Sequence, residues 1–217
     1  MTEFPQTAQN RVRRMPTRGA YDTATIYPIV DEALICHVGL LEAEQPVVIP
    51  TLHARDGDQI LLHGATTSRL LRYAATGAPL CITITLVDGL VLARSIFHHS
   101  INYRSAVLFG RGVLIEGESA KMGALERFTE KLIPGRWDDA RVPNAIELKA
   151  TAVVAVTIES ASAKIRTGPP KDDEEDYALA VWAGVVPLYQ RVGEFQPDER
   201  LDPAIAVPDY LRDYQRG

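Results

Sequence analysis

The sequence predicts a mainly β protein, a small antiparallel barrel of about six strands with few helices. Short apolar segments rich in β-branched residues follow one another, as expected of strands. Asp-Gly pairs at Asp56-Gly57 and Asp88-Gly89 are typical of hairpin turns. One helical pattern is inserted between the third and fourth strands, so antiparallel hairpins are favoured over βαβ units.

Each predicted element is justified by its own pattern. Tyr21–Asp31 reads as a short helix that enters the domain. Ser119–Ile133 places Met122, Leu125 and Phe128 at helical spacing, with Ser119 as a possible N-cap and Pro134-Gly135 as the stop. The remaining elements, in chain order, are strands 33–41, 46–53 and 59–63, helix 66–76, a hairpin of strands 79–87 and 90–97, strand 103–116, and a central strand 148–159.

The chain divides into three parts. Residues 1–20 form a polar N-terminal arm that carries Arg11, Arg13, Arg14 and Arg18, and either contacts a partner or lies over the domain surface. Residues 21–190 form the barrel domain, which includes an acidic, proline-rich loop at 167–176 and an apolar patch at 182–187. Residues 191–217 form a polar C-terminal tail.

Composition excludes several classes of protein. The chain has 217 residues, 46% of them hydrophobic, so it can bury a core without disulfides or a structural metal. Its net charge of −5 argues against nucleic acid as the main partner. No apolar run reaches membrane-spanning length and the start lacks a signal-peptide pattern, so we expect a cytoplasmic protein. Cys36 and Cys81 are expected to be buried free thiols.

The most informative segment is Ile60–Arg72, in which an apolar strand leads into Gly64, hydroxyl residues, Arg69 and a helix. Hydroxyls and free backbone N–H groups at a helix start converge on one point, and an arginine there adds paired donors for a phosphate. The alternative, purely structural interpretation is that the Ser68 hydroxyl caps the helix and that Arg69 forms a surface ion pair.

Other catalytic patterns are weak or absent. The histidines, which are His37, His53, His63, His98 and His99, show no metal-ligand spacing, so no metal site is expected. No G-x-S-x-G, P-loop or G-x-G-x-x-G occurs, which argues against serine hydrolysis and the common nucleotide folds.

Several motifs, taken in order, carry a family resemblance. They are Arg14-x-Pro16-x-Arg18-Gly19, Pro46–Thr51, His63-Gly64-Ala65-x-x-Ser68-Arg69, Asn102-Tyr103-Arg104-Ser105 with Gly110, and Trp182-Ala183-Gly184-Val185-x-Pro187. Over residues 14–187 the chain resembles the pyridoxamine 5′-phosphate oxidase-like family of FMN-binding split barrels, in the branch that includes nitroimidazole-resistance proteins. The resemblance implies a six-stranded split barrel with peripheral helices.

The resemblance also implies a homodimer with FMN in clefts between the subunits. Ser68 and Arg69 match the pair that binds the FMN phosphate, and His63, Gly64 and Ala65 match the turn that approaches it. Val48, Ile49, Pro50 and Thr51 match the strand edge that lines the flavin ring. Asn102, Tyr103, Arg104 and Ser105 match the segment that reaches the flavin, and Trp182 is a further candidate contact.

The chain departs from true pyridoxamine phosphate oxidases. Leu70 stands where those enzymes carry a lysine, and no histidine follows His99. We therefore expect not that reaction but electron transfer from NAD(P)H through FMN to a small oxidised substrate. The alternatives are a flavin carrier without turnover, or a haem-binding barrel that uses His98 or His99.

Overall fold

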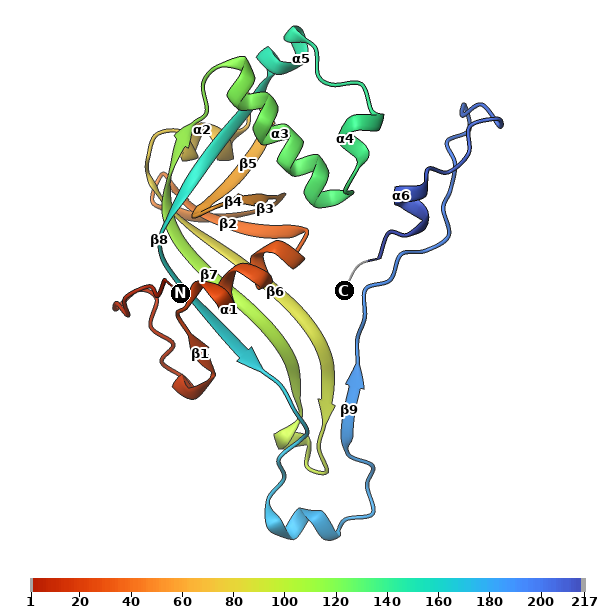
Figure 1. Cartoon of the computed structure of the whole chain (residues 1–217). Helices are drawn as coiled ribbons and strands as arrows, with labels where there is room; N and C mark the ends of the chain where they lie inside the picture. The colour runs from red at the N-terminus through yellow and green to blue at the C-terminus, as the bar shows by residue number, and fades with distance from the viewer. Residues whose placement is uncertain (1, 216–217) are drawn as a thin grey trace.

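The structure, a computed structural model, describes residues 2–215, so the first residue of the predicted arm and the last two of the predicted tail lie outside it. Within the described chain nine antiparallel strands form one sheet in the order β3-β2-β6-β7-β8-β5-β4, with β1 added to β8 and β9 to β6 (Figure 1). The sheet curls into a split barrel. The predicted mainly β class is confirmed, and short strands account for the larger strand number.

The strands and helices alternate as the sequence patterns predict. The strands are β1 (Gly19–Ala20), β2 (Ile35–Glu42), β3 (Gln45–Leu52), β4 (Ala54–Asp56), β5 (Gln59–Ala65), β6 (Pro79–Leu92), β7 (Ser100–Leu114), β8 (Thr151–Arg166) and β9 (Gly184–Pro187). The α-helices are α1 (Thr23–Glu32), α2 (Arg69–Ala74), α3 (Glu118–Leu132), α4 (Arg136–Asp139), α5 (Ala145–Ala150) and α6 (Asp209–Arg212). The 3₁₀ turns are η1 (Pro16–Arg18), η2 (Ile96–His98) and η3 (Glu174–Ala178).

The main core lies inside the barrel, under α1. Asp22 caps this helix, because its Oδ1 accepts a hydrogen bond of 2.8 Å from the Thr25 N–H. Ile26, Ile29 and Val30 follow at helical spacing and are almost wholly buried against the inner face of the sheet. Each such side chain contributes about 1.5–3 kcal/mol of hydrophobic stabilisation.

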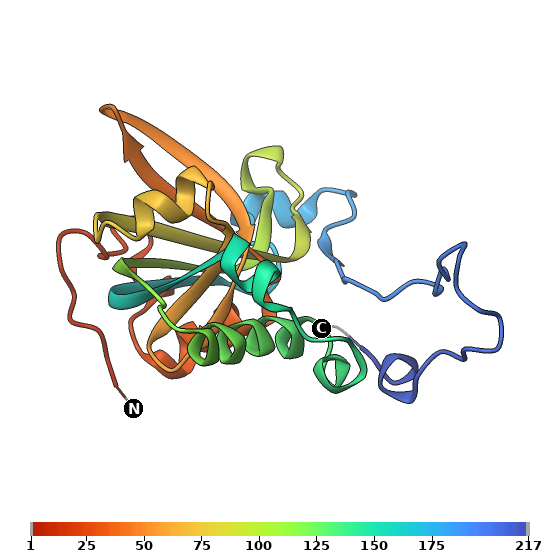
Figure 2. The same ribbon diagram turned by 90° about the horizontal axis from the view of Figure 1, so that it is seen from above.

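A second core lies on the opposite side of β5 and β8, under α3 (Figure 2). Ala124 and Phe128 of α3 pack there against Leu61, Val153 and Ala155. Strand residues alternate between the two cores, since Ile60 and Leu62 face the barrel interior. The central position predicted for the strand around residues 152–158 is confirmed, because β8 pairs with both β5 and β7.

The predicted hairpin turn at Asp88-Gly89 is wrong. β6 runs through these residues, with a register shift between Val87 and Gly89, and the chain turns instead between β6 and β7 at η2. Gly89 is needed for another reason: a Cβ atom there would lie 2.9 Å from the carbonyl oxygen of Val186 on β9. The glycine permits close approach of a neighbouring strand rather than a turn.

Three boundaries also differ from the predictions. The helix expected over residues 66–76 is confined to α2, which begins at Arg69. Ser119 lies inside α3, whose N-cap is Gly117 with a φ of +84°. The strand expected from Leu148 begins at Thr151, because Asn144 and Glu147 form a capping box that starts α5.

The two cysteines are free; Cys36 is buried as predicted, whereas Cys81 is only half-buried. Among the described residues, no helix has the length and apolar character that crossing a membrane requires.

Residues 188–208, which we call the C-terminal strap, loop out to one side of the barrel and stand clear of its body (Figures 1 and 2). The Leu188 N–H donates to the Asp88 carbonyl at one end. At the other end, beyond the strap, the Tyr210 hydroxyl donates to Asp139 at 2.6 Å and the Tyr214 hydroxyl to the Leu132 carbonyl at 2.7 Å. Within the described chain, residues 189–207 make no hydrogen bond to the body. The strap is thus held at both ends and unpaired between them.

Candidate functional site

The ladder pairings show which candidate residues share a face of the sheet. Pro50 of β3 pairs with His37, which pairs with Thr83, which in turn pairs with Val107 of β7. Paired residues point to the same side, so these side chains form one surface, turned away from the barrel core. We call it the outer face. Val48 belongs to it as well, because it lies two residues from Pro50 on β3. Tyr103 and Ser105 also belong to it, because each lies an even number of residues from Val107 on β7.

The outer face holds two adjoining cavities. One of about 310 Å³ is lined mainly by apolar groups of β2, β3, β6 and β7, among them Val48, Cys81 and Phe109. The other, of about 250 Å³, is lined by Ser105, Ser162 and Lys164 together with residues 9–14 of the arm. Gln9 lines both cavities, so the arm crosses the face between them. Ile49, by contrast, packs against the core, and Thr51 pairs with the buried Cys36.

The predicted phosphate turn follows β5. Gly64 and Ala65 end the strand, and the Ser68 hydroxyl accepts from the Leu71 N–H at 3.5 Å, as a helix cap. Arg69 pairs with Glu42 at 3.4 Å, and both side chains are about half exposed. Exposed pairs of this kind contribute little to stability, so the guanidinium remains available to an anion. Glu42 ends β2, so Arg69 lies beside the β2–β3 turn, near the apolar cavity.

His63 points away from the barrel interior. Its ring packs on Phe128 of α3, with 4.2 Å between the ring centroids. Burial lowers the pKa of His63, so the imidazole is neutral near pH 7. Its Nδ1 is buried and has no hydrogen-bond partner in the part of the chain that the structure describes.

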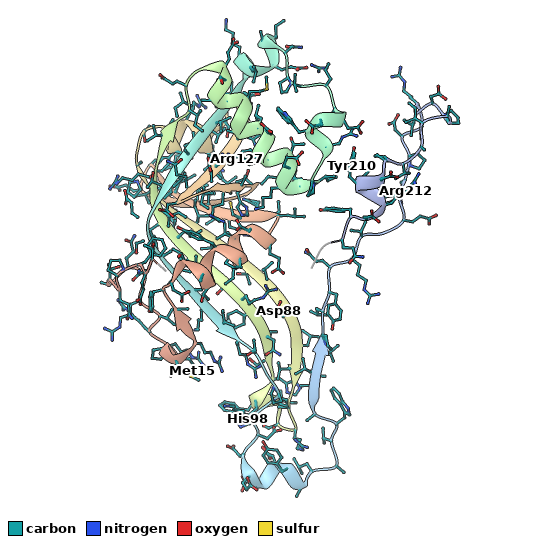
Figure 3. The ribbon with its side chains drawn as sticks, in the orientation of Figure 1. Met15, Asp88, His98, Arg127, Tyr210 and Arg212 are labelled. Atoms are coloured by element: carbon teal, nitrogen blue, oxygen red, sulfur yellow. The ribbon has the colours of Figure 1, made fainter. Side chains whose placement is uncertain are left out.

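Arg104 lies on the opposite side of β7 from Ser105. Its guanidinium donates to both oxygens of Glu32 and to Asp88, and these two carboxylates raise its pKa, Glu32 contributing most. The group borders a cavity of about 480 Å³ that Tyr189 of the strap also lines. Figure 3 shows Asp88 partway along the β6–β7 hairpin. Neither carboxylate was identified from the sequence, because Glu32 and Asp88 are far from Arg104 along the chain and the fold brings them together.

The side chain of Asn102 holds the loop that follows β8. Its Oδ1 accepts from the Arg166 guanidinium, and its Nδ2 donates to the Gly168 carbonyl at 3.2 Å. Arg166 donates to the same carbonyl at 3.2 Å and to that of Pro169. The segment 102–105 is therefore divided: Tyr103 and Ser105 lie on the outer face, where the Ser105 hydroxyl donates to the Lys164 carbonyl at 3.2 Å. Asn102 and Arg104 lie on the other side of β7.

The hairpin end around η2 is clamped by the acidic loop. Asp172, whose side chain is inaccessible to solvent, accepts from the backbone N–H groups of Arg94 and Ser95 and from the Arg94 guanidinium. Ile96 and Phe97 beside it are 85% and 88% exposed. Two large apolar side chains are thus presented on a rigid loop, as in surfaces that bind an apolar ligand or partner.

The two adjacent histidines differ. His98 Nε2 lies 3.2 Å from Asp173, and ligand atoms of His98, Asp173 and Asp176 lie within 4.8 Å of one another (Figure 3). His99 is exposed, and its Nδ1 lies 3.1 Å from the Ser95 carbonyl oxygen and 3.4 Å from the Ala93 nitrogen. The shorter contact, to the Ser95 carbonyl, requires a protonated Nδ1, whereas the Ala93 N–H donates only to an unprotonated one. In the first of these tautomers the lone pair falls on Nε2.

The candidate residues occupy two ends of one long hairpin. Ser68 and Arg69 lie on α2, beside the start of β6, whereas Trp182, which is 66% exposed, neighbours Gly184, the partner of Leu92 at the far end. β6 has 14 residues and would extend about 45 Å if straight. Figure 1 shows α2 and η2 at opposite ends of the molecule. One chain therefore presents two separate sets of candidate groups.

Curled antiparallel strands with helices at the ends and one open face define the class: a split β-barrel. A family model described as pyridoxamine 5′-phosphate oxidase matches residues 22–165. The chain belongs to this family, which confirms the resemblance seen in the sequence motifs. A search of the curated proteins finds no match.

Solved structures with a similar fold include the following three. The flavocytochrome Anf3 from Azotobacter vinelandii is 39% identical with a TM-score of 0.90, over 97% of this chain and 98% of that one. The FAD and heme binding protein from Mycobacterium smegmatis is 36% identical with a TM-score of 0.86, over 90% and 96%. A proposed 5-nitroimidazole antibiotic resistance protein from Bacteroides thetaiotaomicron, 23% identical with a TM-score of 0.56 over 66% and 84%, shares the fold.

Proposed function

We propose that this protein binds a flavin and a haem and transfers electrons between small molecules. One observation carries the proposal. The chain has two candidate sites, one at each end of the β6–β7 hairpin, and it is similar over nearly its full length to proteins named for both cofactors. The flavin would supply hydride and single-electron chemistry and the haem single-electron chemistry, while the protein supplies binding and orientation.

The outer face is the proposed flavin site. An isoalloxazine ring needs an apolar wall, which the cavity beside Val48 offers, and a phosphate needs Arg69 and the Ser68 hydroxyl, which lie near the β2–β3 turn. The sequence motifs favour FMN, whereas the name of the Mycobacterium smegmatis protein favours FAD. Chromatography of the flavin released from the purified protein distinguishes the two.

The loop around η2 is the proposed haem site, where His99 would bind the iron. With Nδ1 protonated, the His99 Nε2 carries the lone pair, and the neighbouring Ile96 and Phe97 offer the apolar surface that a porphyrin requires. His98 is the weaker candidate, since Asp173 engages its Nε2.

The test is the visible spectrum after incubation with flavin and haemin and removal of the excess by desalting. We expect retained flavin bands and a Soret band. Arg69→Ala is expected to lower flavin content at least tenfold, because a charge-assisted contact to phosphate is lost. Arg72→Ala, on the same exposed helix, is the control. Full flavin content in Arg69→Ala would show that the phosphate lies elsewhere.

Turnover separates an oxidoreductase from a carrier. In the proposed enzyme, NAD(P)H bleaches the bound flavin under anaerobic conditions and a small oxidised acceptor restores its colour. A flavin that binds but is not reduced indicates the carrier. Leu70 replaces the lysine of pyridoxamine phosphate oxidases, and no histidine follows His99. We therefore propose that pyridoxamine phosphate is not the substrate.

We also propose a homodimer, in which the C-terminal strap packs on a second copy. Tyr189, Phe195 and Ile205 of the strap are 74%, 42% and 59% exposed, although both ends of the segment are fixed. Burial of such side chains stabilises an interface.

Light scattering is expected to give twice the 23.9 kDa mass of the chain. Phe195→Asp is expected to shift the protein toward the monomer, because it places a charge in the apolar contact. Gln196→Asp, the neighbouring residue, should leave the mass unchanged. A monomeric wild-type protein at micromolar concentration would contradict the dimer.

A further inference from the structure

The N-terminal arm is built into the fold, and its cavity is therefore a defined surface. Asn10 is 3% exposed; it donates to the Ala161 carbonyl of β8 at 3.1 Å and to the Pro5 carbonyl at 3.0 Å. The Val12 N–H donates to the Tyr21 hydroxyl at 2.9 Å. Gly19 allows the arm to pack closely, since a Cβ atom there would lie 3.0 Å from Val12. These contacts hold residues 9–14 over β7 and β8.

This cavity is strongly basic in a protein whose net charge is −5. Arg11, Arg13, Arg14 and Lys164 line it. In the described chain none of these cations lies within ion-pair distance of a carboxylate, and the same holds for the nearby Arg18. Most other arginines in the structure have such a partner. Uncompensated cations around a cavity create a positive potential that attracts an anion.

Buried Arg166 strengthens the positive charge on this side of β8. It is 7% exposed, and its hydrogen bonds go to Asn102 and to carbonyl groups rather than to a carboxylate. Burial lowers its pKa, and the positive charge of nearby Arg18 lowers it further. The fold thus keeps repelling charges near one another without a compensating acid.

We propose that the arm cavity, defined by Arg11, Arg13, Arg14, Lys164 and Ser162, binds an anionic group of a cofactor beyond the first phosphate of the flavin. The chemistry is that of the second phosphate of a dinucleotide pyrophosphate, which arginines bind with paired donors. Ser105 of the proposed flavin site lines the same cavity, so an extended ligand on the outer face reaches it. The inference rests on the proposed function and adds a second anion site to it.

The test compares matched probes on the full chain. Arg13→Glu is expected to weaken binding of FAD about tenfold or more relative to FMN if the second phosphate lies here. Arg13→Lys should retain most of the affinity. Lys149→Glu, at an exposed position of α5 outside both proposed sites, changes the net charge equally and is the control.

Equal losses for FMN and FAD, or losses no larger than those of Lys149→Glu, would overturn the proposal. Should the wild-type protein bind neither flavin nor haem, the proposed function fails, yet the cavity is still testable. Calorimetry with inorganic pyrophosphate then decides: binding that Arg13→Glu abolishes supports an anion site, and no binding to the wild type overturns it.

Discussion

Replacing His99 with alanine is expected to abolish the Soret band of the haem-loaded protein. The lone pair on Nε2 is the proposed ligand of the iron, and no other group on the exposed tip of the loop has the same combination of a fixed Nδ1 and a free Nε2. His98→Ala is the matched control and should keep the band, because Asp173 engages its Nε2. Absorption titration with haemin measures both variants.

Rescue by free imidazole separates loss of the ligand from damage to the loop. In His99→Gly, added imidazole is expected to restore the band, since the Asp172 clamp that shapes the loop is untouched. A Soret band of wild-type intensity in His99→Ala, lost instead in His98→Ala, would reverse the assignment.

Gly110→Ala is expected to destabilise the fold by about 3 kcal/mol or more, in the range of severe overpacking. A Cβ atom at this position would lie 1.9 Å from the carbonyl oxygen of Thr157, which is backbone of the central strand and cannot move aside cheaply. The register of β7 and β8 already shifts between Phe109 and Gly110. Urea unfolding of the cofactor-free protein measures the change.

Gly123→Ala makes the same chemical change where there is space. No atom lies within 4 Å of a Cβ built there, and the residue is inside α3, so the substitution should stabilise the protein by about 0.5–1 kcal/mol. Similar unfolding midpoints for the two variants would show that the strand crossing at Gly110 is looser than its geometry indicates.

The sequence predicted the elements that local patterns determine. The helical pattern over Tyr21–Asp31, the β-rich segment over residues 33–41 and the β-branched run in β8 each predicted the element that forms there. The prediction from sequence was wrong where a strand far away in the sequence determines the local structure. Asp88-Gly89 has the composition of a turn, but the glycine serves the approach of Val186, which lies nearly a hundred residues further along the chain.

The same distinction holds for the candidate site. Ser68 and Arg69 stand at a helix start, as their sequence context predicts, and a capping hydrogen bond forms there. The division of Asn102–Ser105 between two faces follows from strand alternation and could have been anticipated. The partners Glu32 and Asp88 of Arg104 could not, and neither could the Asp172 clamp, because each joins segments that meet only in three dimensions.

The length of the β6–β7 hairpin has a consequence for any electron that enters this protein. Tunnelling rates fall steeply with distance, and the two proposed redox groups lie at opposite ends of a 14-residue strand. If both groups bind as proposed, direct exchange along one chain would therefore be slow. In a two-fold assembly, the flavin end of one copy can lie beside the haem end of the other. The redox unit would then be the pair of chains, with each circuit completed across the subunit boundary.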